Sequence, residues 1–183
     1  MKTNPTSNFG EETGSKQRSL SPMDPIQRFL LNCLIVITVL WVLFGSIIGV
    51  MAAPNDDMFP HIKAKDLVLY YRLERSFHAQ DVVILNKNET PYVGRVIAVA
   101  GDRVEISDDD RLIINGSYVS EPQIYTSTPR LESFVSYPVE LQDGEYFILA
   151  DARNGAEDSR YYGVAKKSEI HGKVFAFIRR NQL

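Results

Sequence analysis

Two adjacent acids, Asp56 and Asp57, stand in the stretch NDDMFPHIKAKD, which follows a long apolar run. A carboxyl group can take up or release a proton, and it can in principle attack a carbonyl carbon. Neighbouring residues in extended backbone point to opposite faces, so the two acids are not expected to share a proton as an aspartic dyad does. Lys63 and Lys65 follow a proline and are expected to face solvent. The stretch therefore offers a carboxylate without an evident base.

The rest of the chain carries few groups that indicate other chemistry. The 183 residues have a net charge of -3, which gives no attraction to nucleic acid. The three histidines are scattered, and Asp108, Asp109 and Asp110 are expected to form a polar turn, because the rest of a calcium-ligand pattern is missing. We expect no metal and no cofactor. Cys33 is the only cysteine, so a disulfide cannot stabilise the domain.

An apolar run, FLLNCLIVITVLWVLFGSIIGVM, extends from Phe29 to Met51 without a charged residue. A helix of that length spans about 34 Å, enough to cross a bilayer and contact membrane lipid. A cleaved signal peptide is the competing interpretation, but its apolar region is usually shorter, about 7 to 15 residues. We therefore predict a transmembrane anchor over residues 29–51. Gly45 and Gly49 form a G-x-x-x-G pair that can mark a helix contact.

The segments on either side of the anchor differ in character. Residues 1–28 are rich in Ser, Thr, Asn, Gln and Gly, and we predict a disordered cytoplasmic tail. Lys16, Arg18 and Arg28 precede the anchor, whereas Asp56 and Asp57 are the first charges after it. The positive-inside rule then predicts that residues 52–183 form an extracytoplasmic domain of a single-pass protein in the cell membrane.

Beyond residue 60 the apolar residues alternate with polar ones, a pattern typical of strands. Asn115-Gly116 lies between two β-rich arms and predicts a hairpin. Three prolines interrupt the pattern between residues 120 and 138, where we predict a long loop or irregular excursion. The fold class is all-β, with folded antiparallel sheets or a partly closed barrel. The predicted strands are 67–73, 81–85, 92–100, 103–106, 111–119, 145–150 and 172–178.

Four blocks of this sequence resemble, in order, the conserved boxes of type I signal peptidases. They are MFP followed by KD (58–66), QDVVIL (80–85), YVGRVIAVAGDRVEI (92–106) and ADARNGAEDSRYYG (150–163). The resemblance implies a membrane-anchored β fold in which a Ser-Lys dyad cleaves signal peptides. It also implies a scaffold role for the residues that match the boxes outside the dyad: Asp66, Gly101, Asp102, Asp151, Arg153, Asp158, Ser159, Arg160 and Gly163.

The positions that carry chemistry in that family depart from its pattern here. Asp57 stands where the family has its serine, Gly94 where it has its lysine, and Ala156 where it has the serine that orients the lysine. These departures predict a protein that is not an enzyme, a catalytically inactive relative with no catalytic residues. The former site is expected to remain as a peptide or partner cleft, widened at Gly94. The residues expected to form it are Asn55, Asp57, Met58, Pro60, Gly94 and Arg95.

The sequence also resembles degenerate signal-peptidase-like proteins encoded beside sortases and pilins in streptococcal pilus clusters. That resemblance implies a membrane-anchored assembly factor for sortase-dependent pili at a Gram-positive cell surface, with pilin subunits, the pilus sortase or both as partners. Two alternatives stay open. One is an active serine-type signal peptidase with altered catalytic groups, and the other is an extracytoplasmic binding protein unrelated to pili.

Overall fold

A computed structural model describes residues 24–131 and 135–180 of the chain. The first 23 residues of the predicted tail, residues 1–28, lie outside the described residues. Helix α1 (Pro25–Val42) already includes the last four residues of that tail. A proline is well suited to the first helical position, because its missing N–H would have no partner there.

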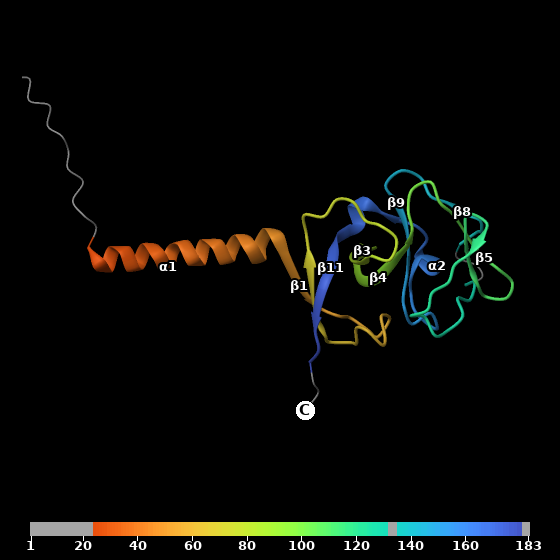
Figure 1. The fold of residues 1–183 in the computed structure, drawn as a ribbon, viewed down its shortest axis with the longest axis horizontal. Coiled ribbons are helices and arrows are strands. Elements are labelled where there is room, and N and C mark those ends of the chain that lie inside the picture. The colour runs from red at the N-terminus through yellow and green to blue at the C-terminus, as the bar shows by residue number, and fades with distance from the viewer. Residues whose placement is uncertain (1–23, 132–134, 181–183) are drawn as a thin grey trace, which may run out of the picture. The chain divides into compact units, whose positions relative to one another are not determined.

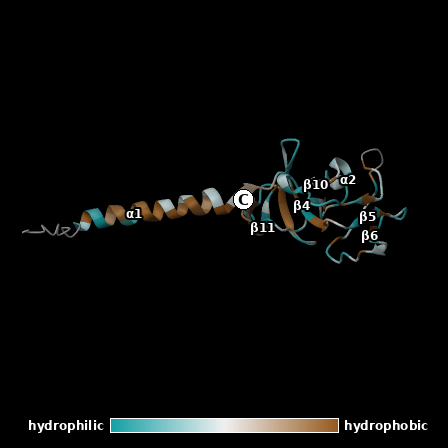
Figure 2. Cartoon of the chain, turned by 90° about the horizontal axis from the view of Figure 1, so that it is seen from above, coloured by the Kyte–Doolittle hydropathy of each residue, from teal (hydrophilic) through white to brown (hydrophobic). Residues whose placement is uncertain are grey.

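The apolar run forms a helix that ends earlier than the sequence predicts. Helix α1 continues into one π-helical stretch, η1 (Leu43–Ile47). Together, Pro25–Ile47 are long and apolar enough to cross a membrane, judged by length and composition. Figure 2 shows α1 coloured as hydrophobic over most of its length. This agrees with the predicted anchor, residues 29–51, except at its carboxyl end.

Residues 48–51 belong to strand β1 (Ile48–Ala52) instead of the helix. A Cβ atom at Gly49 would lie 2.0 Å from a ring carbon of Tyr70, so the strand accepts only glycine there without a shift of that ring. The suggestion that Gly45 and Gly49 mark one face of a membrane helix is therefore wrong. Gly49 lets the ring of Tyr70 pack against the backbone of β1.

The strands after the helix form two sheets in which every pairing is antiparallel. The larger sheet has the order β1-β2-β11-β3-β4-β9-β10 and the smaller one β7-β6-β5-β8. Figure 1 labels β1, β11, β3, β4 and β9 of the larger sheet and β5 and β8 of the smaller one. Besides β1, the strands are β2 (Leu67–Tyr71), β3 (Val82–Lys87), β4 (Thr90–Ala98), β5 (Arg103–Ile106), β6 (Leu112–Ile114), β7 (Ser117–Tyr118), β8 (Val139–Glu140), β9 (Glu145–Leu149), β10 (Ala165–Lys166) and β11 (Ile170–Ile178). A short helix, α2 (Ser159–Tyr162), and a 3₁₀ turn, η2 (Lys167–Glu169), complete the elements.

The prediction of an all-β domain of antiparallel sheets is confirmed, and neither sheet closes into a barrel among the described strands. Each predicted strand exists, with ends that differ by up to two residues, and the predicted 111–119 arm is the hairpin of β6 and β7. Asn115 and Gly116 both have positive φ, 51° and 79°, as the turn requires. The sequence pattern missed β1, β8, β10 and α2, which are short or hidden in the apolar run.

Strands β3 and β4 lie in the middle of the larger sheet, and both of their faces are covered. On β3, Val83 and Leu85 join one core cluster, whereas Ile84 joins another with Met58 and Val93. Such burial on both faces explains the continuous apolar run VVIL. A third cluster, which includes Val104, Leu112 and Phe147, holds the smaller sheet against the larger.

The described part of the predicted excursion, residues 120–131 and 135–138, contains no helix or strand. It is nevertheless attached to the domain, because Glu121 and Thr128 bind the buried side chain of Arg153. Thr128 also donates its backbone N–H to the carbonyl of Asp110 at 2.8 Å.

Candidate functional site

Asp57 is half-buried at the start of the loop that joins β1 to β2. The side-chain amide of Asn55 donates a hydrogen bond to its Oδ2 at 2.6 Å, and the Asp57 backbone N–H donates to Asn55 Oδ1 at 3.2 Å. The Asp57 carbonyl accepts a hydrogen bond from Ala152 N at 2.8 Å. The carboxyl group is therefore held by Asn55, and the backbone of Asp57 is held by the loop that follows β9.

The neighbouring acid, Asp56, is used differently. Its Oδ1 accepts a hydrogen bond from the backbone N–H of Ala64 at 2.8 Å, and its carbonyl accepts one from Phe59 N. Asp56 thus closes the loop, while Asp57 is held by Asn55. The two acids have separate partners, as their adjacent positions predict.

Burial raises the pKa of Asp57 above its usual value, the hydrogen bond from Asn55 lowers it, and the negative charges of Asp158, Glu157 and Asp56 raise it further. The net direction is upward. A carboxyl group with a raised pKa holds its proton to a higher pH than an exposed aspartate. When protonated it both donates and accepts hydrogen bonds.

Gly94 lies in β4 with its missing side chain directed at β9. A Cβ atom there would lie 2.5 Å from Ile148 Cγ2 and 3.4 Å from the carbonyl oxygen of Leu149. The expectation that Gly94 widens the cleft is therefore wrong. Ile148 occupies the space that a side chain at position 94 would need.

Ala156 is buried, in the loop that leads to α2. The next two residues are acids. Tyr92 Oη donates a hydrogen bond to Glu157 Oε2 at 2.9 Å, and Asp158 is the N-cap of α2. The position that the family fills with an orienting serine thus contributes a methyl group beside two carboxylates.

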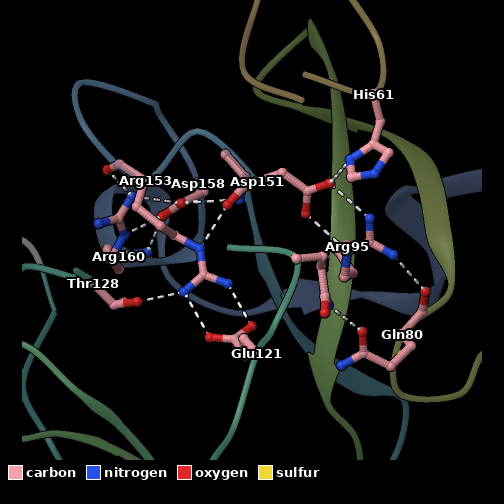
Figure 3. A network of polar contacts seen from close by, with 11 residues as sticks. His61, Gln80, Arg95, Glu121, Thr128, Asp151, Arg153, Asp158 and Arg160 are labelled. Carbon is pink, nitrogen blue, oxygen red and sulfur yellow. Dashed lines mark hydrogen bonds and ion pairs between the residues drawn. The ribbon is translucent and has the colours of Figure 1, made fainter. Parts of the chain in front are cut away.

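A second group of polar residues lies on the opposite face of β4 from Gly94, since successive residues of a strand point to opposite faces. Arg95 binds Asp151 with two hydrogen bonds, Nε–Oδ1 at 2.8 Å and Nη2–Oδ2 at 2.6 Å. Its Nη1 donates to the carbonyl of Gln80, and His61 Nδ1 lies 3.6 Å from Asp151 Oδ2 (Figure 3). Hydrogen bonding to Asp151 raises the pKa of Arg95, which favours the charged guanidinium.

Two fully buried arginines extend this network, as Figure 3 shows. Arg153 binds Glu121 with both terminal nitrogens, at 3.0 and 2.6 Å, and also donates to Thr128. Arg160 binds both oxygens of Asp158, at 2.9 and 2.8 Å, and donates to the carbonyl of Arg153 at 2.7 Å. Buried charges require such partners, and these pairs fix the loop between β9 and α2.

The remaining residues predicted to form the scaffold also have local structural partners. Asp66 accepts hydrogen bonds from the backbone N–H groups of Lys63 and Arg180. Asp102 accepts from Val99 N and from the side chain of Asn115. Ser159 Oγ accepts from Ile148 N. Gly101 and Gly163 have φ of 89° and 81°, values that favour glycine.

Two of the six residues predicted to form one cleft line a common cavity. A cavity of about 540 Å³ is lined by Met58 and Arg95, but its lining includes none of Asn55, Asp57, Pro60 and Gly94. Lys63 and Lys65 are exposed, as expected. Within residues 24–131 and 135–180, no cluster of His, Cys, Asp and Glu could hold a metal ion.

Four residues that contact the predicted site residues were not predicted from the sequence: Gln80, Glu121, Thr128 and Ile148. A buried arginine such as Arg153 needs an acid, and Glu121, in the proline-rich excursion, was a candidate on that ground alone. Nothing in the sequence pairs Ile148 with Gly94, because that contact depends on the register of β4 and β9.

Comparisons with known proteins find one family. The family model "Signal peptidase, peptidase S26" matches residues 26–178. The chain is 27% identical to signal peptidase I S of Bacillus subtilis over 180 residues, 92% of this chain and 97% of that protein. It is 30% identical to signal peptidase I of Bacillus licheniformis, over 70% and 76% of the two chains. A crystal structure of a signal peptidase I from Enterococcus faecalis matches 55% of this chain and 97% of that one, with 27% identity and a TM-score of 0.46.

These matches correct the prediction that the chain is not an enzyme. The relatives are named signal peptidase I, and peptidases are enzymes. That prediction was based on the residues at positions 57, 94 and 156. Similarity to the family, however, extends across most of the chain. The apolar helix and these relatives also fit a single-pass membrane protein.

Proposed function

Because the chain belongs to the signal peptidase family, peptidase S26, we propose that it binds extended segments of exported polypeptides at the outer face of a cell membrane and serves sortase-dependent pilus assembly there. The observation that carries this proposal is the state of the family's reactive position. The carboxyl group of Asp57 is held there by Asn55, and the backbone carbonyl of Asp57 accepts a hydrogen bond from the loop after β9.

Such a group suits the binding of a polypeptide backbone. An ionised carboxylate accepts hydrogen bonds from peptide N–H groups, and a protonated one can also donate to a carbonyl. The scaffold around it is rigid, because the loop that donates Ala152 N to Asp57 also carries the buried pairs of Asp151, Arg153 and Asp158. Extended segments are commonly bound as strands added beside existing ones, through hydrogen bonds between backbones.

The direction of the chain in the membrane is part of the proposal. Asp57 follows Ile47, the last residue of the candidate span, by ten positions, which limits its distance along the chain to about 35 Å. The positive charges before the span support an orientation in which the domain lies outside the cell. In that orientation, Asp57 lies near polypeptides as they leave the membrane.

The partners in this proposal are pilin subunits, the pilus sortase or both. They follow from the resemblance to signal-peptidase-like proteins of pilus clusters. Deleting the gene should remove the high-molecular-weight pilin ladder, and the wild-type gene should restore it. An Asp57→Ala gene should restore it poorly at equal protein levels. A ladder unchanged by the deletion would end the pilus role.

Signal-peptide hydrolysis is the second candidate, and the names of the relatives favour it. The full chain in detergent is incubated with a synthetic presecretory peptide, and the products are identified by mass spectrometry. Cleavage that is lost in Asp57→Ala and kept in Asp56→Ala would support an altered peptidase with Asp57 at its centre. Peptide binding that Asp57→Ala weakens supports the binding role, whether or not products form.

A further inference from the structure

The larger sheet contains a slot where β3 begins and β11 runs on. Pairing between the two strands starts at Val83 opposite Lys173, and β11 continues to Ile178 with β2 along its other edge. No described strand pairs with the β3-side edge of β11 beyond Lys173. The backbone groups of residues 174–178 on that edge are therefore available to another strand.

The chain leaves this position open for a local reason. Before β3, the segment stays hydrogen-bonded to β4, through Gln80 N to Val96 O and Val96 N to Asp81 O, both at 2.8 Å. Gln80 has φ 77°, a left-handed conformation that turns the chain away from β11. The position beside β11 that β3 would have occupied had it continued is therefore not filled by a described strand.

Apolar side chains line this space, and they include two exposed aromatic rings. The cavity of about 540 Å³ lies here, a size typical of ligand pockets. Met58, Ile62 and Val174 form its apolar base as members of a core cluster, and Phe175 and Phe177 are 56% and 42% exposed. Exposed phenylalanines beside an unpaired strand edge favour an apolar extended segment over water.

The charges around the slot select the character of that segment. The acids near it are largely covered, with the side chains of Asp81 and Asp151 13% and 1% exposed. The cationic or donor groups are open, since Lys173 is 40% exposed and His61 50% exposed. Lys173 Nζ spends one donor on Asp81 at 2.6 Å, and its amine has three. An acidic residue is thus the complementary neighbour.

We propose that the slot between the start of β3 and the free edge of β11 binds an extended peptide with alternating apolar residues and one acidic residue, added as a strand to β11. This site is separate from the Asp57 position, because Asp57 is not among its lining residues and Gly94 faces the other side of β4. The slot therefore supplies a second contact for an exported polypeptide.

The test uses the full chain in detergent and a fluorescein-labelled synthetic peptide, Gly-Thr-Val-Glu-Val-Phe-Val-Thr-Gly, with binding followed by anisotropy. Phe175→Ser should weaken binding about tenfold or more, because it removes an exposed anchor. The matched control is Tyr125→Ser, at an aromatic ring that is 82% exposed and outside the slot. That variant should bind as the wild type does.

Two further measurements identify the mode of binding. A peptide N-methylated at alternate amides should lose affinity about tenfold, since it cannot complete a strand pairing. Replacing its glutamate by glutamine should weaken binding to the wild type but not to Lys173→Met. Asp57→Ala, measured beside Phe175→Ser, distinguishes failure here from failure of the proposed function, because binding that is lost in Phe175→Ser belongs to the slot and binding that is lost in Asp57→Ala belongs to the Asp57 position.

The contrary outcomes are equally clear. Equal binding to the wild type and Phe175→Ser would overturn the site, and equal binding of the N-methylated peptide would overturn strand addition. If only Asp57→Ala lost binding, the peptide would be bound at the Asp57 position instead of the slot. A self-association of the chain that Phe175→Ser abolishes, or uptake of detergent alone in the slot, would replace the peptide as occupant.

Discussion

At the scale of single residues, the site is governed by one carboxyl group and one glycine. Asp57 is half-buried among other acids, so its charged form is disfavoured, although Asn55 offsets part of that cost. Gly94 is fixed by its neighbour, because Ile148 leaves no space for a side chain. Electrostatics thus determines the charge state of Asp57, and packing determines which side chain fits at position 94.

The pKa of Asp57 predicts how its substitution affects stability. Because its folded-state pKa is raised, the folded protein binds more protons than the unfolded chain, and the charged carboxyl destabilises the fold as pH increases. Asp57→Asn removes that charge and keeps an oxygen for Asn55. We expect a gain at pH 7 of less than about 1 kcal/mol in the free energy of unfolding.

The gain should shrink as pH falls and disappear below about pH 4, near the ordinary pKa of aspartate, where both states hold the proton. Urea unfolding at pH 7, 5.5 and 4 measures it. Asp56→Asn is the control, and its change should not follow this course. A stability loss in Asp57→Asn that grows with pH would contradict the argument.

Gly94 predicts a packing effect. Gly94→Ala brings a Cβ to 2.5 Å from Ile148 Cγ2, so we expect a loss of about 1 to 3 kcal/mol, the usual cost of overpacking. Gly94→Lys should lose at least as much. Ile148→Ala loses stability by forming a cavity.

A double-mutant cycle separates the two effects. In Gly94→Ala/Ile148→Ala the new methyl group gains space, so the loss should be smaller than the sum of the single losses, measured by urea unfolding. Additive losses would mean that the backbone of β4 moves away from β9 instead.

At the scale of the elements, alternation in strands was predictable and contact between strands was not. The β3 segment and the Asn115-Gly116 turn follow from local pattern. Strand β1 was hidden, because IGVMA is apolar on both sides and continues the membrane run without a break in hydropathy. The slot beside β11 could not be predicted either, because it depends on how far β11 extends beyond its pairing with β3.

The irregular excursion 120–138 shows how one buried ion pair can hold an element without secondary structure. The side chain of Arg153 is fully buried and that of Glu121 is 8% exposed. Glu121→Ala leaves a buried guanidinium without its carboxylate, so we expect a loss of about 3 kcal/mol in the free energy of unfolding. Urea unfolding at pH 7 measures it.

Asp109→Ala is the matched control. It removes a carboxylate paired with Arg111, where both side chains are more than half exposed, so its effect should stay within about 1 kcal/mol. Comparable losses in the two variants would show that burial does not determine the strength of the Glu121–Arg153 pair.

At the scale of the whole molecule, the first strand of the β domain follows the candidate membrane span directly in the sequence. Strand β1 begins at Ile48, directly after the candidate span ends at Ile47. Family membership and the single apolar helix follow from sequence blocks and composition, because both are continuous along the chain. The side of the membrane on which the domain lies is a consequence of charges around the helix, and it can be measured.

The lone cysteine makes that measurement direct. In a Cys33→Ser background, Ser76→Cys places a thiol at an exposed position of the domain, and Ser7→Cys places one before the helix. The positive-inside rule predicts that an impermeant maleimide labels Cys at position 76 in intact cells and at position 7 only after lysis. Labelling of position 7 alone in intact cells would reverse the orientation, because only the segment before the helix would then face outward. It would also remove the domain from the path of exported polypeptides.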